Sequence, residues 1–271
     1  MTSKTLPCTR LEPRPAAASM PTRRWNLSGL SLCISPALLL IVWELATRLG
    51  WVSPQLLPAP SAIVLRLLEL ATEADFWRNL GLTVYRLLCG LLIASVLGVV
   101  LALAAQLSRW SALLLDALIR LLAPIPKIAL YPALILILGF ESASKISLVV
   151  SDAIFPVLMA SWVAAQTVDR KLIWSARAAG TSRAACLWKV VLPAICPTVL
   201  AGVRVAGVIA CVVVFLAEMI ASTDGLGHML TAAARSYRIT DMFVPLVWIC
   251  LLGFALNLTI AALQRKVDHT G

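Results

Sequence analysis

The chain has 271 residues, of which 61% are hydrophobic without counting glycine, and its formal net charge is +10. An average soluble domain is only about 45–50% apolar with glycine included. Apolar segments long enough to cross roughly 30 Å of hydrocarbon, about 20 residues as a helix, recur along almost the whole chain. This composition excludes an ordinary soluble domain and predicts an all-α membrane protein.

The N-terminal segment leads into the first apolar run. Residues 1–22 are rich in Pro, Ala, Thr and Ser, and we expect residues 1–28 to form a disordered cytoplasmic tail. The pair Arg23-Arg24 raises the alternative of a twin-arginine or Sec signal peptide. However, residues 27–47 are longer than a signal-peptide core of about 7–15 residues, and no small-x-small cleavage site follows. A retained first span anchored by the arginines is therefore favoured.

The apolar segments predict about six transmembrane helices, at 29–48, 81–107, 121–140, 145–167, 196–218 and 243–263. After the first, the run Leu57-Pro58-Ala59-Pro60-Ser61 stops helical propagation. Ser61 is placed to cap an amphipathic helix that continues to about Glu73. We expect this helix to rest at the outer membrane interface.

Two of the spans have unusual composition. Span 81–107 carries small residues that permit close helix packing, namely Gly81, Gly90, Ala94 and Gly98. Span 121–140 holds Pro124, Pro126 and Pro132, and each proline removes a backbone donor. Because interrupted helix at membrane depth survives only inside protein or beside a water-filled cavity, we expect this span to line a pore.

An even number of spans places both termini on one side of the membrane. If that side is cytoplasmic, the segments on it (1–28, 108–111, 168–195 and 264–271) carry thirteen Lys and Arg residues, and the opposite segments carry four. Positive charge is retained preferentially on the cytoplasmic side, so both termini are expected there. The net charge is thereby explained by topology, with membrane lipid rather than nucleic acid as the partner.

The sequence of segment 168–195, between the fourth and fifth spans, predicts two short helices. Residues 170–179 favour helix, and Gly180 suits the left-handed turn that follows a helix C-terminus. Thr181 or Ser182 is placed to cap the second helix.

On that second helix one face carries Ala184, Leu187 and Val191, and Pro193 is expected to end it. A short amphipathic element of this kind fits a groove on another protein. A plain amphipathic connector on the lipid surface is the alternative.

The spacing of this loop resembles the EAA loop of binding-protein-dependent ABC importer permeases, written EAA-x3-G-x9-I-x-LP. Gly180, Leu192 and Pro193 match the pattern, and Val190 stands conservatively for its Ile. Ala176 is the matching residue of the EAA triplet. The other two triplet positions are Trp174 and Ser175.

Further motifs in family order resemble the branch that handles nitrate, sulfonates and taurine, over about residues 57–265. They are Leu57–Ser61, Pro124–Ala129 with Leu138–Glu141, and Gly225–Gly227 after Glu218-Met219. The resemblance implies a MetI-like permease architecture over residues 29–267, including a coupling loop at 168–195. It also implies the multi-pass subunit of an ATP-driven importer in the cytoplasmic (inner) membrane, translocating a small solute such as an anion.

In that family two permease subunits form the pore, and a homodimer is the expectation here. Two cytosolic ABC ATPases dock on the paired loops, and a periplasmic or extracellular solute-binding protein delivers the substrate. The resemblance assigns ATPase docking to Ala176, Gly180, Val190, Leu192 and Pro193. Because the chain contains no G-x4-G-K-[ST] motif, ATP is expected to be used by the partner, with no catalytic, cofactor or metal site on this chain.

Charges inside spans are costly and are candidates for function. The candidates are Arg86, Asp116, Arg120, Lys127, Asp152, Arg204 and Glu218. For most of them we favour intramembrane pairs or snorkelled anchors over substrate contacts. Lys127, beside Pro124 and Pro126, is the predicted pore-lining cation. In the outer loop 219–242, we expect the binding protein to contact Gly225, Gly227 and Arg235.

Two other classes of function are alternatives to an importer subunit. An intramembrane hydrolase is disfavoured, since no G-x-S-x-G or H-E-x-x-H motif occurs and both histidines lie outside the spans. Half of a secondary carrier driven by an ion gradient is the main alternative, with Asp116, Asp152 and Glu218 as its carboxylates. The seven cysteines show no CxxC spacing for metal or redox chemistry. The substrate, and the choice between homodimer and heterodimer, stay open.

Overall fold

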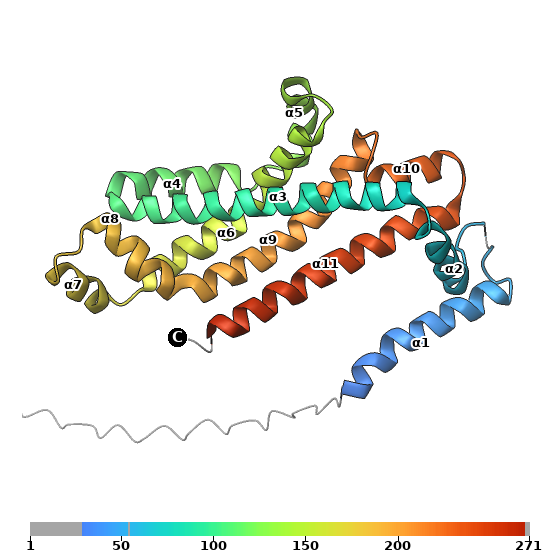
Figure 1. Cartoon of the computed structure of the whole chain (residues 1–271), viewed down its shortest axis with the longest axis horizontal. Coiled ribbons are helices and arrows are strands. Elements are labelled where there is room, and N and C mark those ends of the chain that lie inside the picture. The colour runs from blue at the N-terminus through green and yellow to red at the C-terminus, as the bar shows by residue number, and fades with distance from the viewer. Residues whose placement is uncertain (1–28, 54, 269–271) are drawn as a thin grey trace, which may run out of the picture. The chain divides into compact units, whose positions relative to one another are not determined.

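The computed structural model describes residues 29–53 and 55–268, and throughout this part of the chain the regular elements are helices (Figure 1). The predicted tail at residues 1–28 lies outside the described residues. Two units are distinguished, one ending at Val42 and one beginning at Trp43. Helix α1 (Gly29–Arg48), which coincides with the first predicted span, contains this division.

Four long helices dominate the second unit: α3 (Ala74–Ala104), α6 (Ser142–Thr167), α9 (Leu192–Ile220) and α11 (Ile239–Asp268). The shorter ones are α2 (Pro60–Leu70), η1 (Ala105–Leu107), α4 (Arg109–Leu122), η2 (Lys127–Leu130), α5 (Tyr131–Leu138), α7 (Arg170–Ala178), α8 (Arg183–Cys186), η3 (Leu187–Val191) and α10 (Leu226–Arg235).

Four helical stretches among the described residues are long and apolar enough to cross a membrane, or five if the bent pair α4 and η2–α5 is one span. The all-α membrane class is therefore confirmed. With α1 added as the first predicted span, the predicted number of six is approximately right.

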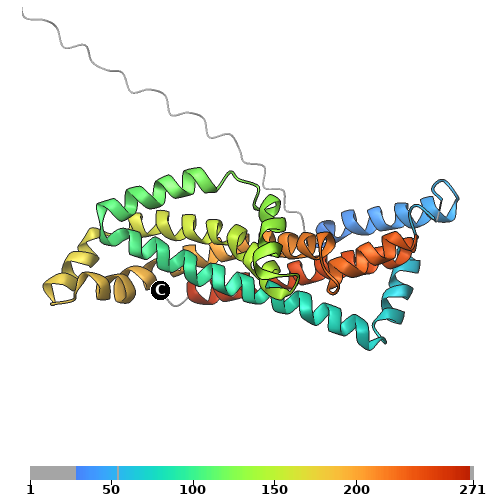
Figure 2. The same ribbon diagram turned by 90° about the horizontal axis from the view of Figure 1, so that it is seen from above.

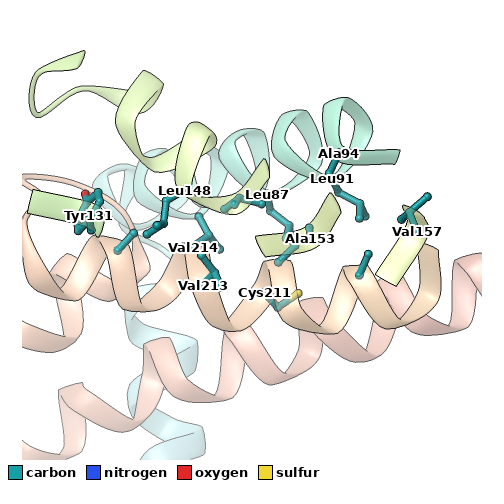
Figure 3. Packing of buried hydrophobic residues seen from close by; sticks show 14 residues of the cluster. Leu87, Leu91, Ala94, Tyr131, Leu148, Ala153, Val157, Cys211, Val213 and Val214 are labelled. Atoms are coloured by element: carbon teal, nitrogen blue, oxygen red, sulfur yellow. The ribbon is translucent and has the colours of Figure 1, made fainter. Parts of the chain in front are cut away.

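Helix α6 lies between α3 and α9, and α11 packs on the other side of α9 (Figures 1 and 2). Figure 3 shows the core between them, where side chains such as Leu87, Leu148 and Val214 are at most 2% exposed. Small residues bring the helices together as predicted, because Gly90 lies against Val149 of α6. Gly81 is the exception, since a side chain there would meet open space.

The predicted single span at 121–140 is wrong in its boundaries. Helix α4 begins at Arg109 and ends at Leu122, and the chain resumes as η2–α5 from Lys127 at an angle of 85°. The interruption contains Pro124 and Pro126, whose missing N–H groups prevent a continuous ladder of hydrogen bonds. The prolines thus interrupt the helix, as expected, and the interruption lies in the middle of the observed stretch 109–138.

The start of α2 also differs from the prediction. Its N-cap is Ala59 rather than Ser61, since Pro60 has the backbone geometry for the first helical turn. Instead, Glu44 of α1 accepts hydrogen bonds from the Ser61 backbone N–H (3.0 Å) and hydroxyl (2.7 Å). A carboxylate from another helix therefore replaces the local cap.

Candidate functional site

Two polar regions lie at opposite ends of α9, as Figure 1 shows: the loop of α7 and α8 at one end and the segment before α10 at the other. In the first, Asp169 caps α7 by accepting from the Lys171 N–H at 2.9 Å. Gly180 has a φ of +85°, and Ser182 caps α8 by accepting from the Ala185 N–H at 3.2 Å. The predicted arrangement of helix, left-handed glycine and capped second helix is confirmed.

The expected end of the second helix at Pro193 is wrong. Residues Arg183 to Ile220 form one continuous helical stretch, because η3 is a π-helical turn in which the Leu192 N–H bonds to the Leu187 carbonyl. Pro193 is the second residue of α9 and directly follows this π-helical turn, which carries the helix past the proline. The loop is therefore joined to α9 without an interruption.

The amphipathic face of this helix packs inside the chain. Val191 is buried with Leu103 and Ala164, and Leu187 packs against the same cluster. Ala184 stays exposed. The surface available to a partner lies largely on α7, none of whose side chains is buried.

Large exposed apolar side chains mark this surface: Leu172, Trp174 and Trp188. Of the predicted docking residues, Gly180 and Pro193 are exposed, while Ala176, Val190 and Leu192 are half-buried. A cleft of about 210 Å³ between α7, α8 and η1 is lined by residues that include Gln106, Arg177 and Arg183.

In the interrupted span, Lys127 is only 7% exposed. Its ammonium group donates to the Ala123 carbonyl at 2.8 Å, lies 3.6 Å from an Asp152 carboxylate oxygen and sits 4.3 Å from the centre of the Phe155 ring. Pro124 and Pro126 are exposed. The cation predicted to line a pore is thus buried in an ion pair at the edge of an apolar groove of about 350 Å³.

Most of the other charged candidates also have partners within the chain. Asp116 and Arg120 form an exposed pair at 2.8 Å one turn apart on α4. Arg204 of α9 donates to the side-chain carbonyl of Asn257 on α11. Asp116 and Arg120 thus pair within the chain as expected, whereas the partner of Arg204 is a neutral amide.

The second polar region is built around Glu218, near the end of α9, which is fully buried. Its carboxylate accepts from Arg86 of α3 at 2.8 Å, from the Thr83 hydroxyl at 2.8 Å and from the Gly227 N–H at 3.1 Å. Arg86, 1% exposed, also donates to Ser142 at 3.0 Å and to the Asp224 carboxylate. The guanidinium is therefore bound on each of its nitrogens.

The same region caps the N-terminus of α10 from other helices. The Gly225 N–H donates to Asn79 at 2.7 Å, the Leu226 N–H to the Thr83 hydroxyl at 2.9 Å, and the Gly227 N–H to Glu218. These N–H groups have no acceptor within their own helix. The negative carboxylate of Glu218 also interacts favourably with the positive end of the α10 dipole.

Gly225 and Gly227, which were expected on a surface that contacts the binding protein, are instead buried against Glu218. Gly225 is buried with φ +96°, and a Cβ there would collide with the Glu218 carboxylate. A Cβ on Gly227 would lie 2.7 Å from that of Glu218 and 2.9 Å from the Met219 nitrogen. Neither is accessible to a binding protein in this structure, whereas Arg235 at the end of α10 is exposed.

Asp224 is the one carboxylate of this region outside the spans, and its side chain is 31% exposed. Burial alone would raise the pKa of Asp224, but the hydrogen bond and positive charge of Arg86 outweigh burial, so the pKa is lowered. Sequence reasoning missed Asn79, Thr83 and Asp224. It also missed Lys145, which is 1% exposed and donates to the Phe140 carbonyl.

The fold is a bundle of apolar helices that holds buried ion pairs and presents an exposed, basic, tryptophan-bearing loop at one end. This arrangement defines the class: an integral membrane protein with an exposed basic loop. Residues 94–270 match the family described as binding-protein-dependent transport system inner membrane component, and the chain belongs to that family.

Relatives agree with this assignment over most of the chain. The chain is 32% identical to a protein of Escherichia coli (strain K12) named for aliphatic sulfonates transport, the permease protein SsuC, over 90% of this chain and 93% of the relative. It is also 32% identical to the taurine transport system permease protein TauC of the same organism, over 90% and 91%.

Solved structures of low identity share the fold. A bacterial ABC transporter involved in the import of the acidic polysaccharide alginate superposes with a TM-score of 0.64 at 14% identity, over 87% of this chain and 95% of that one. The MetNI methionine ABC transporter gives 0.55 at 20% identity, over 70% and 93%.

The chain is thus a multi-pass permease subunit of an ATP-driven ABC importer in the inner membrane. In this family the ATPase is a separate partner chain that uses ATP, and a solute-binding protein is the other partner. The secondary-carrier alternative is not supported.

Proposed function

We propose that this permease imports small sulfonates, with an organic sulfonate such as taurine as the substrate class. The observation that carries the proposal is the agreement of two relatives, one named for aliphatic sulfonates and one for taurine, each over about nine-tenths of this chain. We also propose which side of the membrane holds the termini, where the ATPase and the binding protein dock, and that two copies of the chain pair.

The loop 168–195 is the proposed docking site for the ATPase. Its exposed side carries Trp174 and Leu172, which leave an apolar surface uncovered in the free subunit. Between Asp169 and Lys189 the loop holds five basic residues, and its one acidic residue, Asp169, caps α7. A partner groove with an apolar floor and acidic rim therefore fits this loop.

The cytoplasmic side is proposed to contain both termini and this loop. The support is the excess of Lys and Arg on that side, thirteen against four. The opposite end, with α10 and the turn at residues 236–238, then faces the binding protein. Arg235, Tyr237 and Arg238 are exposed there, and we keep the proposed binding-protein contact for Arg235 only.

A second copy of the chain is proposed to complete the pore. Helix α5 projects from the layer of α3, α6 and α9 (Figure 1), and Leu136 and Ile137 on it are 88% and 77% exposed. Membrane lipid or a second subunit is the environment that suits such a surface. Pro124, Pro126 and Lys127 lie at the start of this segment, so we retain them as the proposed pore residues.

The test is transport by a reconstituted complex. The permease is co-expressed with the ATPase and binding protein encoded beside its gene, purified, and placed in liposomes with ATP inside. Uptake of radiolabelled taurine and of an alkanesulfonate is expected, dependent on both ATP and binding protein, while methionine is not taken up. Uptake of neither sulfonate, with uptake of another solute, refutes the substrate class. Uptake that persists without ATP refutes the energy source.

A further inference from the structure

The buried polar cluster around Glu218 occupies a particular place relative to the helices. Glu218 is near the end of α9, and the other end of α9 continues through η3 into the loop that carries Gly180. Arg86 and Thr83 come from α3, and Asp224 and Gly227 come from the segment that begins α10. One cluster therefore joins the helix leading to the docking loop with the helix at the opposite end of the subunit.

The polar groups of the cluster are engaged with one another. A cleft of about 610 Å³ borders Arg86 and Asp224, but each nitrogen of the Arg86 guanidinium already has a partner in Ser142, Glu218 or Asp224. Glu218 is 0% exposed. A role in holding helices in register fits these contacts better than a role in binding a solute.

The attachment of α10 is unusually dependent on side chains of other helices. Its first N–H groups are satisfied by Asn79 and Thr83 of α3 and by Glu218 of α9. Gly225 and Gly227 leave no room for a side chain between α10 and Glu218. Any displacement of α9 relative to α3 would break hydrogen bonds that α10 cannot replace from within its own helix.

We infer that the residues Thr83, Arg86, Glu218 and Asp224 are positioning residues for transport, which fasten α10 to α9 so that contact at the outer end is transmitted to the docking loop. This inference rests on the proposed function, in which a binding protein meets the outer end and an ATPase meets the loop. We call these four residues the α10 latch.

Thr83 offers the sharpest variant, because its hydroxyl both donates to Glu218 and accepts from the Leu226 N–H. Thr83→Val keeps the volume and removes both hydrogen bonds, while Thr83→Ser keeps them. Thr231→Val is the matched control, since Thr231 bonds only to carbonyls of its own helix, those of Gly227 and His228. Glu218→Gln is a second variant that removes one acceptor and the charge.

The experiment measures ATP hydrolysis per assembled complex in nanodiscs, without and with liganded binding protein, together with uptake. For Thr83→Val and Glu218→Gln, hydrolysis without binding protein stays at the wild-type level, and the increase on adding binding protein falls about tenfold, as does uptake. Thr83→Ser and Thr231→Val behave as wild type.

Two results overturn the latch. In one, both rates fall in the same proportion per assembled complex, which is what a purely structural role predicts. In the other, Thr83→Val and Glu218→Gln respond to the binding protein as wild type does. If instead the wild-type complex itself shows no response to binding protein, the proposed function fails and the latch fails with it, so the two failures are told apart by the wild-type measurement.

Discussion

The packing of α3 against α6 predicts how glycine substitutions change the stability of the subunit, and α3 itself contains a control position. Gly90 and Gly81 both lie within α3, but a Cβ on Gly90 would sit 2.5 Å from Cγ1 and 2.8 Å from Cβ of Val149, whereas a Cβ on Gly81 meets nothing within 4 Å. Val149 is fully buried, and a β-branched side chain has little rotamer freedom in a helix. The neighbour therefore cannot move aside cheaply.

The magnitudes follow from two opposed effects. Replacing glycine with alanine inside a helix stabilises it by about 1 kcal/mol, and this gain applies to Gly81→Ala and Gly90→Ala alike. Overpacking a tight core costs about 1–3 kcal/mol, and this cost applies only to Gly90→Ala. We therefore expect Gly81→Ala to be stabilised, Gly90→Ala to lie between neutral and about 2 kcal/mol destabilised, and the two to differ by about 1–3 kcal/mol.

Thermal unfolding of the purified subunit in detergent, followed by tryptophan fluorescence, measures the difference. A second variant, Val149→Ala, removes the Cγ1 methyl that the new Cβ would meet at 2.5 Å and keeps the Val149 Cβ at 2.8 Å. In the double variant, Gly90→Ala is expected to lose part of its penalty, which appears as a coupling energy between the two sites. Equal melting temperatures for Gly81→Ala and Gly90→Ala would refute the packing argument.

Three further predictions concern the loop, the latch and the interrupted span. Gly180→Ile places a β-branched residue at φ +85°, so membrane insertion should persist while ATPase co-purification and uptake are lost; normal uptake would contradict the docking role. Because the pKa of Asp224 is lowered in the folded chain, its stabilising effect is present above the ordinary carboxyl value of about 3.9 and is lost as the pH falls through the lowered value. The melting temperature of the wild type should therefore drop more than that of Asp224→Asn below about pH 4, and parallel pH profiles would count against this. Lys127→Met and Asp152→Asn break the same pair, so a larger loss of taurine uptake in Lys127→Met supports a pore role, and equal losses indicate a structural pair.

Local signals in the sequence predicted much of the fold. Gly180 and Ser182 have the conformation and the cap expected from their residue types, because both depend on a few neighbouring residues. The proline run at 124–126 interrupts its helix for the same reason. The error at Pro193 arose because a proline usually ends a helix, while here the π-helical turn η3 carries the helix past it.

The α10 latch could not be predicted from local sequence patterns, because its residues are far apart in the chain. Arg86 and Glu218 were both recognised as intramembrane charges, but they are 132 positions apart in the chain, and nothing in either segment specifies the pair. Asn79 and Thr83 cap a helix that begins more than a hundred residues later. Capping rules search the residues next to a helix start, so a cap supplied by another helix leaves no local pattern.

The latch and the loop together restrict how this subunit can move. Helix α9 has 29 residues and is therefore about 43 Å long. Gly202 on it packs so closely that a Cβ would lie 3.0 Å from the Pro156 carbonyl of α6. Because α6 and α9 contact each other through backbone at this point, neither slides past the other without opening the core, and we expect them to move as one body. The bend between α4 and α5 is held differently, since Pro124 and Pro126 interrupt the hydrogen-bond ladder and side-chain contacts such as the Lys127–Asp152 pair hold the following segment to α6. Movement that opens a path for a solute is therefore expected at this bend, while the α6–α9 body carries the displacement from the loop.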